Sequence, residues 1–283
     1  MPLPHKTPSV KALALYLLSY RSARHMKRKA EKRNLIISLS PDLQDLLRHG
    51  PNSEPIEYPL KRRASLKDIV ESLGIPHTEI GAIQADGREA DFGFIPEPGQ
   101  TIQVSAAAVP FDVTRPSLLR PEPLPAVRFV VDVNVGRLAA LLRLTGFDAA
   151  YENKLEDGQI AALAHREKRI VLSKDRALLK RSKIVFGRLV RAVRPDDQLR
   201  ETLHFFGLAG PYELFTRCLL CNRVLEPVAK TDILHRLEPK TKKYFHTFKI
   251  CPACDRIYWR GSHCDAMAAK LAQSGLCGTQ EPL

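Results

Sequence analysis

The sequence lacks an apolar run long enough to cross a lipid bilayer. The candidate run, Val10 to Tyr20, has eleven residues, whereas a transmembrane helix needs about 20. Basic residues follow it, where a secretory signal would carry a cleavage site of small residues. A basic amphipathic helix, or a start codon placed too far upstream, explains this run better. We therefore expect no membrane contact, no export signal and a cytoplasmic location.

Cysteine is scarce, with six residues in 283. Four of them form two C-x-x-C pairs, Cys218-Leu219-Leu220-Cys221 and Cys251-Pro252-Ala253-Cys254. Without an export signal, such pairs favour a metal site over disulfide bonds. Four thiolates at ~2.3 Å complete the tetrahedron of one Zn²⁺ and leave no open position for water, so we predict a structural zinc site. We expect Cys264, Cys277 and His263 to lie outside the ligand set.

Acidic residues are fewer than basic ones, 31 against 44, and the imbalance is uneven along the chain. Residues 1–33 carry a net charge of +8, residues 34–126 carry −5, residues 127–217 carry +6 and residues 218–283 carry +4. A basic C-terminal half after an acidic module favours a polyanionic partner for that half. A solvated basic surface without a partner explains the charge equally well.

Internal repeats are absent, and proline marks the clearest boundary. Five prolines fall within residues 110–125, which predicts a stiff, extended linker. A softer boundary lies at Gly210-Pro211, ahead of the first cysteine pair. We therefore divide the chain into a basic leader (1–32), an α+β domain (33–109), the linker (110–125), an α/β domain (126–210) and a cysteine-containing C-terminal region (211–283).

The α+β domain has the pattern of a β-grasp fold. Strands are predicted over residues 34–39 and 55–60, then a helix from the N-cap Ser65 to Leu73, a hairpin through Asp86-Gly87 and a last strand over residues 101–105. Residues 65–105 resemble the ubiquitin-like sulfur-carrier proteins. The terminal Gly-Gly of a carrier is missing, which favours a binding or scaffolding role over thiocarboxylate chemistry.

The α/β domain has the pattern of a parallel sheet with helical crossovers. A buried strand over residues 127–131 precedes a helix over residues 138–144 that stops at Gly146. A second helix opens at Asp157-Gly158, and a second buried strand covers residues 169–173. This strand, helix, helix, strand order predicts parallel pairing.

Three acidic residues could meet at one edge of that sheet. Asp132 and Asp175 each follow a buried strand, and Asp157 begins a helix that can face the same edge. Ligands of parallel sheets collect at the carboxyl ends of the strands. Converging carboxylates repel one another unless a cation neutralises them, and hard oxygen ligands suit Mg²⁺ or Mn²⁺. The pattern therefore predicts a divalent-cation site that could act on a phosphodiester through a bound water.

Each aspartate also has a purely structural explanation. Asp132 could end its strand in an Asx-turn, Asp157 could cap its helix, and Asp175 could pair with Lys174 or Arg176. A fourth acid could come from residues 196–197, although a solvated loop fits those residues better.

Basic and aromatic side chains alternate around the second cysteine pair, between Lys240 and Arg260. This mixture is typical of surfaces that neutralise phosphates and stack on bases. The aromatic residues could equally form the small core of a zinc domain.

Taken with these motifs, residues 127–264 resemble the Mut-seven C-terminal RNase family, a PIN-like nuclease domain followed by a zinc ribbon. The carriers of the resemblance are Phe129-Val130-Val131-Asp132 with Gly136-Arg137-Leu138-Ala139, Ile170 to Asp175, the two cysteine pairs, and Tyr258 to His263. Bacterial members commonly have a ubiquitin-like module first, as residues 34–108 suggest. Ser173-Lys174 stands where the family usually has Thr-Arg.

The resemblance implies a fold, a site and an activity. Residues 126–210 would be the PIN-like domain and residues 211–283 the zinc ribbon and tail. Asp132, Asp157 and Asp175 would be the acidic metal ligands, and Asn134 could orient one of them. The family's fourth acid is not placed, which leaves one or two metals open.

We therefore predict a Mg²⁺- or Mn²⁺-dependent ribonuclease that hydrolyses RNA, such as tRNA, rRNA or mRNA, with water as nucleophile. The β-grasp module would bind a protein partner. The main alternative is a non-catalytic RNA- or ribosome-binding adaptor that keeps the nuclease fold. A sulfur-transfer accessory protein is a weaker alternative.

Overall fold

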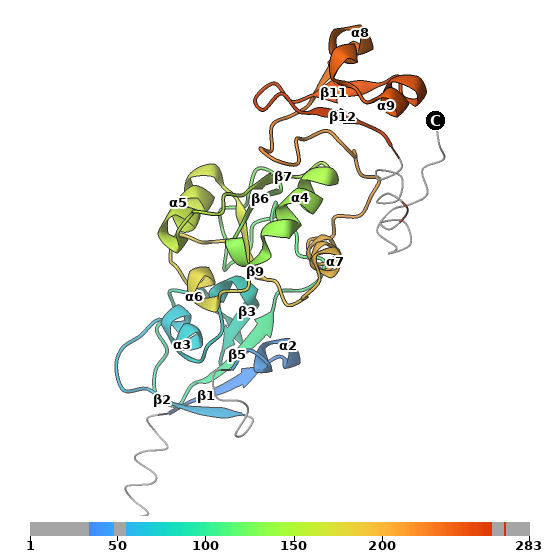
Figure 1. Ribbon diagram of the computed structural model, residues 1–283. Coiled ribbons are helices and arrows are strands. Elements are labelled where there is room, and N and C mark those ends of the chain that lie inside the picture. Colours follow the sequence, from blue (N-terminus) through green and yellow to red (C-terminus); the bar gives the residue numbers. More distant parts are fainter. Residues whose placement is uncertain (1–33, 48–54, 262–268, 270–283) are drawn as a thin grey trace, which may run out of the picture. The chain divides into compact units, whose positions relative to one another are not determined.

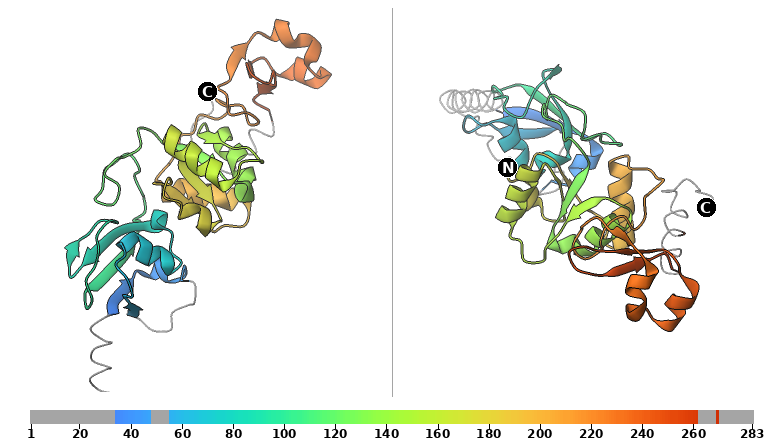
Figure 2. Two further views of the ribbon diagram at one scale, coloured as in Figure 1. Left: turned by 90° about the vertical axis from the view of Figure 1, so that its left-hand side faces the viewer. Right: turned by 90° about the horizontal axis from the view of Figure 1, so that it is seen from above.

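The computed structural model describes residues 34–47, 55–261 and 269, and the chain forms two compact units (Figures 1 and 2). Unit 1 comprises Met1–Leu73 and Ala82–Ser105, and unit 2 comprises Gly74–Gly81 and Ala106–Leu283. The predicted basic leader, with His263, Cys264 and Cys277, lies outside the described residues. Within the described ranges, no helix combines the length and the apolar composition needed to cross a bilayer.

The sheet of unit 1 has the order β2-β1-β5-β3-β4. Strands β1 and β5 lie side by side and are parallel. On its other side β1 pairs with β2, which is antiparallel to it, and β5 is followed by β3, which pairs antiparallel with β4. This is the predicted β-grasp arrangement. The strands are β1 (Asn34–Leu39), β2 (Ile56–Pro59), β3 (Ile80–Ala85), β4 (Arg88–Glu89) and β5 (Thr101–Ala106).

Local sequence signals place the helix and the hairpin of unit 1 as predicted. In helix α3 (Leu66–Ser72), the Ser65 side chain accepts a hydrogen bond from the Asp68 amide at 3.2 Å, which caps the first turn. Asp86 and Gly87 have φ values of 49° and 76°, as a two-residue hairpin loop requires. The short helix α2 (Pro41–Gln44) was not predicted, because one turn shows no hydrophobic periodicity.

The sheet of unit 2 is four-stranded and parallel throughout, with the order β7-β6-β8-β9. Strands β6 (Arg128–Val131) and β8 (Ile170–Ser173) are the two predicted ones and form the centre. The outer strands, β7 (Asp148–Ala150) and β9 (Gly187–Leu189), were missed. Three residues are too few for a period to be recognised.

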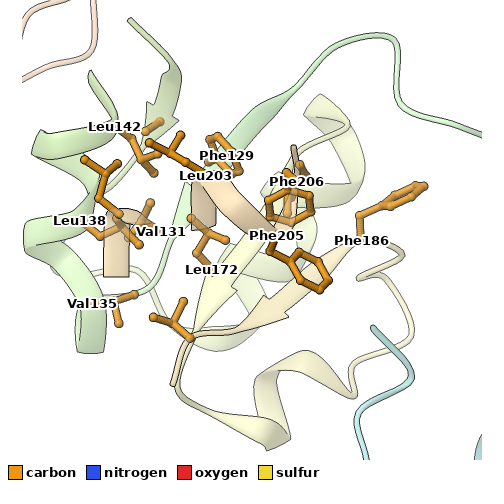
Figure 3. Packing of buried hydrophobic residues seen from close by; sticks show 14 of the residues in the cluster. Phe129, Val131, Val135, Leu138, Leu142, Leu172, Phe186, Leu203, Phe205 and Phe206 are labelled. Atoms are coloured by element: carbon orange, nitrogen blue, oxygen red, sulfur yellow. The ribbon is translucent and has the colours of Figure 1, made fainter. Parts of the chain in front are cut away.

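Helices cover both faces of this sheet (Figures 1 and 2). On one face, α4 (Gly136–Leu144) and α7 (Pro195–Phe205) pack with Phe129, Val131 and Leu172, as Figure 3 shows. The alternate strand residues are also buried and leave the second face to α5 (Asp157–Glu167) and α6 (Arg176–Leu179). Two-sided burial explains why these strands read as continuous apolar runs.

The proline-rich segment 110–125 belongs to unit 2, whereas its composition predicted an extended linker. Val113 and Leu124 are buried in the core cluster. The Arg120 side chain is only 2% exposed and donates to the carbonyls of His77 (3.0 Å), Ile80 (2.9 Å) and Val185 (3.2 Å). Composition alone cannot reveal this packing, because the acceptors come from distant parts of the chain.

The C-terminal region of unit 2 is a small antiparallel sheet with the order β10-β11-β12. Its strands are β10 (Glu226–Val228), β11 (Phe248–Ile250) and β12 (Ile257–Trp259), and helices α8 (Lys230–Ile233) and α9 (Pro239–Tyr244) lie between β10 and β11. The first cysteine pair precedes β10, and the second connects β11 to β12. This is the predicted zinc-ribbon arrangement.

Candidate functional site: an acidic strand edge and a four-cysteine cluster

Asp132 lies directly after β6 and is 5% exposed. Its Oδ1 accepts a hydrogen bond from the Val133 amide at 2.6 Å, and its Oδ2 accepts from Asn134 Nδ2 and Ser173 Oγ, both at 2.6 Å. Asp132 therefore caps the 3-10 helix Val133–Val135 through the amide of the next residue, and the expected Asx-turn, which uses the amide two residues on, is not the bond that forms. Because Ser173 comes from the neighbouring strand β8, the carboxylate is also held in one orientation by the sheet itself.

Asp175 is connected to the same network through Ser173. The Asp175 amide donates to Ser173 Oγ at 2.8 Å, while the Asp175 side chain caps helix α6 by accepting from the Ala177 amide at 2.6 Å. Asn134 Oδ1 accepts from the Lys174 amide at 3.0 Å and ties the two strand ends together again. The structure thus brings Asp132, Asn134, Ser173 and Asp175 to one edge.

Asp157 is the first residue of α5, as predicted, but its carboxylate has a different partner. It pairs with Arg181 at 3.4 Å, and both side chains are partly exposed. The capping residue of α5 is Glu156, in a capping box with Gln159, so Asp157 does not serve as the N-cap. The described contacts do not bring Asp157 into the network of Asp132.

The donor set at this edge is chemically suited to a hard divalent cation, because it consists of carboxylate, amide and hydroxyl oxygens. Among the described residues, however, three or more metal-ligand side chains within 4.8 Å of one another occur only at the cysteine cluster. The three aspartates form no such group. An ion held by all three would require Asp157 to leave Arg181 and approach.

Tyr151 is a residue of this edge that the sequence argument missed. It follows β7 directly, and its ring lies against Gly136 at the start of α4: a methyl group at Gly136 would lie 2.5 Å from the hydroxyl oxygen. Glycine is therefore needed at position 136 for Tyr151 to occupy this place. Its position after a strand could have indicated it, had the three-residue strand been recognised.

The four predicted zinc ligands form one compact cluster. The sulfur atoms of Cys218 and Cys254 are 3.4 Å apart, those of Cys221 and Cys251 are 3.4 Å apart, and those of Cys221 and Cys254 are 3.9 Å apart. A tetrahedron with Zn–S bonds of ~2.3 Å has edges of ~3.8 Å. The cluster therefore fits a Zn²⁺ ion with four thiolate ligands.

The two cysteine pairs have matching backbone geometry. In each pair the residue after the second cysteine, Asn222 or Asp255, has a left-handed φ (68° and 59°) and donates its amide to the carbonyl of the first cysteine at 3.0 and 2.9 Å. The amide of Cys218 donates to the carbonyl of Arg223 at 2.8 Å, and the amide of Cys251 donates to the carbonyl of Arg256 at 2.9 Å. Asn and Asp tolerate this conformation best among residues with a side chain, so the local sequence prepares both turns for a metal.

Burial and hydrogen bonds act in opposite directions on the Cys218 thiol. Burial would raise its pKa, but hydrogen bonds from the Tyr258 hydroxyl and from backbone amides prevail and lower its pKa to about 6. Burial and the neighbouring sulfur atoms raise the pKa of Cys221 and of Cys254. A Zn²⁺ ion on the four sulfur atoms would stabilise all of them as thiolates.

The first cysteine pair is anchored to the α/β part of unit 2. Arg143 on α4 is 3% exposed and donates to the carbonyls of Leu219 and Leu220 at 2.9 and 2.7 Å. Asn222 donates to the Asp148 carboxylate at 2.8 Å and accepts from the Ala149 amide at 3.2 Å. These contacts attach the first cysteine turn to helix α4 and strand β7.

Asp148 is the acidic residue on which this attachment depends. Burial would raise its pKa, but hydrogen bonds from Arg169 (2.6 Å) and Asn222, with the charges of Arg169 and Arg217, hold the pKa of Asp148 below its ordinary value. A carboxylate with a lowered pKa in the folded state stabilises the fold above its unfolded pKa of about 3.9. That contribution disappears as the pH falls through the lower folded pKa.

We expect Asp148→Asn to lower the free energy of unfolding at pH 7 by roughly 2 kcal/mol, because Arg169 loses the carboxylate at 2.6 Å and keeps only Glu167, at 2.7 Å, as a charged partner. Urea unfolding of the wild type and the variant from pH 7 down to pH 2 measures this. The difference between the two should shrink in acid, where the wild-type carboxylate is protonated. A constant difference across that range would contradict the assignment.

The aromatic residues of the ribbon fall into two groups. Phe248 is 2% exposed and belongs to a small core with Ile233 and Leu237, so the core explanation holds for it. Trp259 is 38% exposed and Tyr244 is 63% exposed, although both are large and apolar. Part of the aromatic set therefore lies at the surface beside basic side chains.

These observations define a class of protein: a β-grasp fold, then a parallel α/β domain with acidic residues at its carboxyl edge, then a four-cysteine ribbon. Residues 127–271 match the model of the Mut7-C RNase domain, and residues 33–112 match that of Mut7-C ubiquitin. The first match covers a little over half of the chain, which therefore belongs to the Mut7-C RNase family. Searches of curated proteins and of solved structures give no match.

Proposed function

We propose that this protein is a metal-dependent ribonuclease that hydrolyses RNA phosphodiester bonds in the cytoplasm. The observation that carries the proposal is the network in which Ser173 connects Asp132 to Asp175 at the carboxyl edge of the sheet, in a chain with an RNase domain. Carboxylates held at such an edge are placed for a ligand that approaches the ends of the strands.

Asp132, Asp157 and Asp175 would hold Mg²⁺ or Mn²⁺. When bound, such an ion supplies an activated water and charge stabilisation for the leaving oxygen. Ser173 and Asn134 fix the orientation of the Asp132 carboxylate through Oδ2, and Val133 donates to Oδ1, so one lone pair, on Oδ1, remains for a metal ion. Asp157 would exchange its exposed ion pair with Arg181, which costs little because exposed pairs are worth about 0–1 kcal/mol.

The other parts of the chain would support this reaction. Zn²⁺ on Cys218, Cys221, Cys251 and Cys254 would stabilise the ribbon, and the basic C-terminal half would attract RNA, such as tRNA, rRNA or mRNA. The ubiquitin-like domain would recruit a protein partner. Thiocarboxylate chemistry is not part of the proposal, because residues 101–106 lead into further chain and not into a terminal Gly-Gly.

One observation favours a second candidate, a non-catalytic RNA- or ribosome-binding adaptor. Asp157 is paired with Arg181 and stands apart from the Asp132 network. An adaptor would have no need to gather the three carboxylates around a cation.

Cleavage assays separate the two candidates. The protein is loaded with one equivalent of zinc, freed of other cations, and incubated with labelled tRNA, rRNA or mRNA with and without millimolar Mg²⁺ or Mn²⁺. We expect cleavage only when one of these ions is added. Stable binding without cleavage of any of the three substrates would favour the adaptor and overturn the nuclease.

A further inference from the structure

A cavity of about 490 Å³ opens in unit 2 beside the zinc cluster. Three segments line it: residues 211–215, which lead into the ribbon, Thr247 and Lys249 at β11, and residues 258–260 at β12. We call it the ribbon cavity. Its volume falls in the range of about 300–1,000 Å³ that is typical of small-molecule sites, and none of the predicted metal ligands lines it.

The indole of Trp259 forms a fixed wall of the ribbon cavity. Its ring packs against the rings of Phe245 and Phe248 with centroids 6.4 and 6.3 Å apart. A methyl group at Gly261 would lie 3.1 Å from the indole nitrogen, so the chain passes closely there. The side chain is nevertheless 38% exposed. An aromatic ring that packs against other rings, lines a cavity and remains partly exposed is suited to stacking.

Two basic side chains line the same cavity. Lys249 donates to the Phe215 carbonyl at 3.1 Å. This bond fixes the position of the ammonium group, and because an ammonium group has three donors, it can still donate to a phosphate. Arg260 is the second cation, and Glu213 is the acid among the lining residues. The cavity therefore joins an exposed aromatic ring to an excess of positive charge.

We propose that the ribbon cavity binds one nucleotide unit of single-stranded RNA, with the base stacked on Trp259 and the adjoining phosphate at Lys249. The inference rests on the proposed function, since the RNA bound there would be the substrate. Proteins that stack bases on aromatic rings and neutralise phosphates, without hydrogen bonds to the base edges, bind single strands of many sequences. A duplex keeps its bases stacked inside, so it cannot use this site in the same way.

Trp259 is the one tryptophan of the chain, so its fluorescence reports the cavity directly. The zinc-loaded full chain carrying Asp132→Asn, which prevents cleavage, is titrated with a short oligouridylate and with an abasic oligomer of the same ribose-phosphate length. We expect quenching by the oligouridylate and an affinity for the abasic oligomer that is weaker by roughly tenfold. Equal quenching and equal affinity would overturn the proposal.

Matched variants separate stacking from loss of folding. Anisotropy of a labelled oligouridylate should show roughly tenfold weaker binding for Trp259→Ala and a smaller loss for Trp259→Phe, which keeps a ring. Tyr244→Ala removes an aromatic side chain that is exposed outside the cavity and should bind like the parent. Lys249→Gln should reduce the salt dependence of binding by about one phosphate contact. Zinc content confirms that each variant is folded.

The outcomes also distinguish this inference from the proposed function. Base-dependent quenching without cation-dependent cleavage by the wild type would support the ribbon cavity and reject the nuclease. Cleavage with affinities that are indifferent to the base, or equal losses for Trp259→Ala and Tyr244→Ala, would reject the cavity and leave the nuclease standing.

Discussion

Asp132→Asn should lower the rate of RNA cleavage by more than about 100-fold. Replacing an outer-shell partner of a metal ligand typically costs about 10–100-fold, and the loss of a charged ligand should cost more. Single-turnover cleavage of labelled RNA at saturating Mg²⁺ or Mn²⁺ measures the effect, and RNA affinity should be unchanged. Ser173→Ala should show a smaller loss, since it removes only the hydroxyl that orients the Asp132 carboxylate.

Two controls make this result specific. Glu122→Gln removes one negative charge from a side chain that is 85% exposed and pairs with Lys168, so it should leave the cleavage rate unchanged. Asp132→Asn itself should lower the free energy of unfolding by only about 1 kcal/mol, because one of the donors to Asp132 then faces an amide nitrogen. Full activity of Asp132→Asn would remove the metal assignment, whatever else the protein binds.

Cys218→Ser should abolish stoichiometric zinc binding and unfold the ribbon. Structural zinc contributes an apparent binding free energy of about 10–16 kcal/mol in isolated zinc-finger peptides, where metal binding and folding are one process. The ribbon has little else to hold it, since its buried core consists of two small clusters. Zinc content by atomic absorption and protection of β11 amides in hydrogen exchange measure the two parts of the prediction.

The effect should reach beyond the ribbon. Arg143 and Asp148 lose their partners in the first cysteine turn when the cluster opens, so the unfolding temperature of the α/β part should fall as well. Cys277→Ser is the matched control and should keep one zinc per chain. Retention of zinc by Cys218→Ser, or an α/β part that is indifferent to zinc, would show that the cluster and the sheet are not linked.

Much of the fold was predictable because its signals are local. Ser65 caps α3, Asp86-Gly87 forms the hairpin turn, and the buried runs of β6 and β8 are the centre of a parallel sheet. The short outer strands β7 and β9 were not predictable. Their pairing energy comes from neighbours that are distant in sequence, and three residues carry no readable period.

In the candidate site, too, the features that depend on local sequence were predictable and those that depend on distant contacts were not. The CxxC pairs predicted the zinc cluster, because each turn is built from four adjacent residues. The strand ends predicted that Asp132 and Asp175 share an edge, and their network through Ser173 agrees with this. The partner of Asp157 was not predictable, because Arg181 is 24 residues away in the sequence and no local pattern connects the two.

The sequence by itself thus indicated the family, its two folds, the four cysteines that cluster and the position of Asp132 and Asp175 after buried strands, since each depends on neighbours along the chain. Only the tertiary structure decided that the proline-rich segment packs in unit 2, that Arg143 and Asp148 hold the first cysteine turn, and that Trp259 lines a cavity with Lys249. Burial and ion pairing depend on which distant groups meet when water is excluded, and that is set by packing rather than by local spacing.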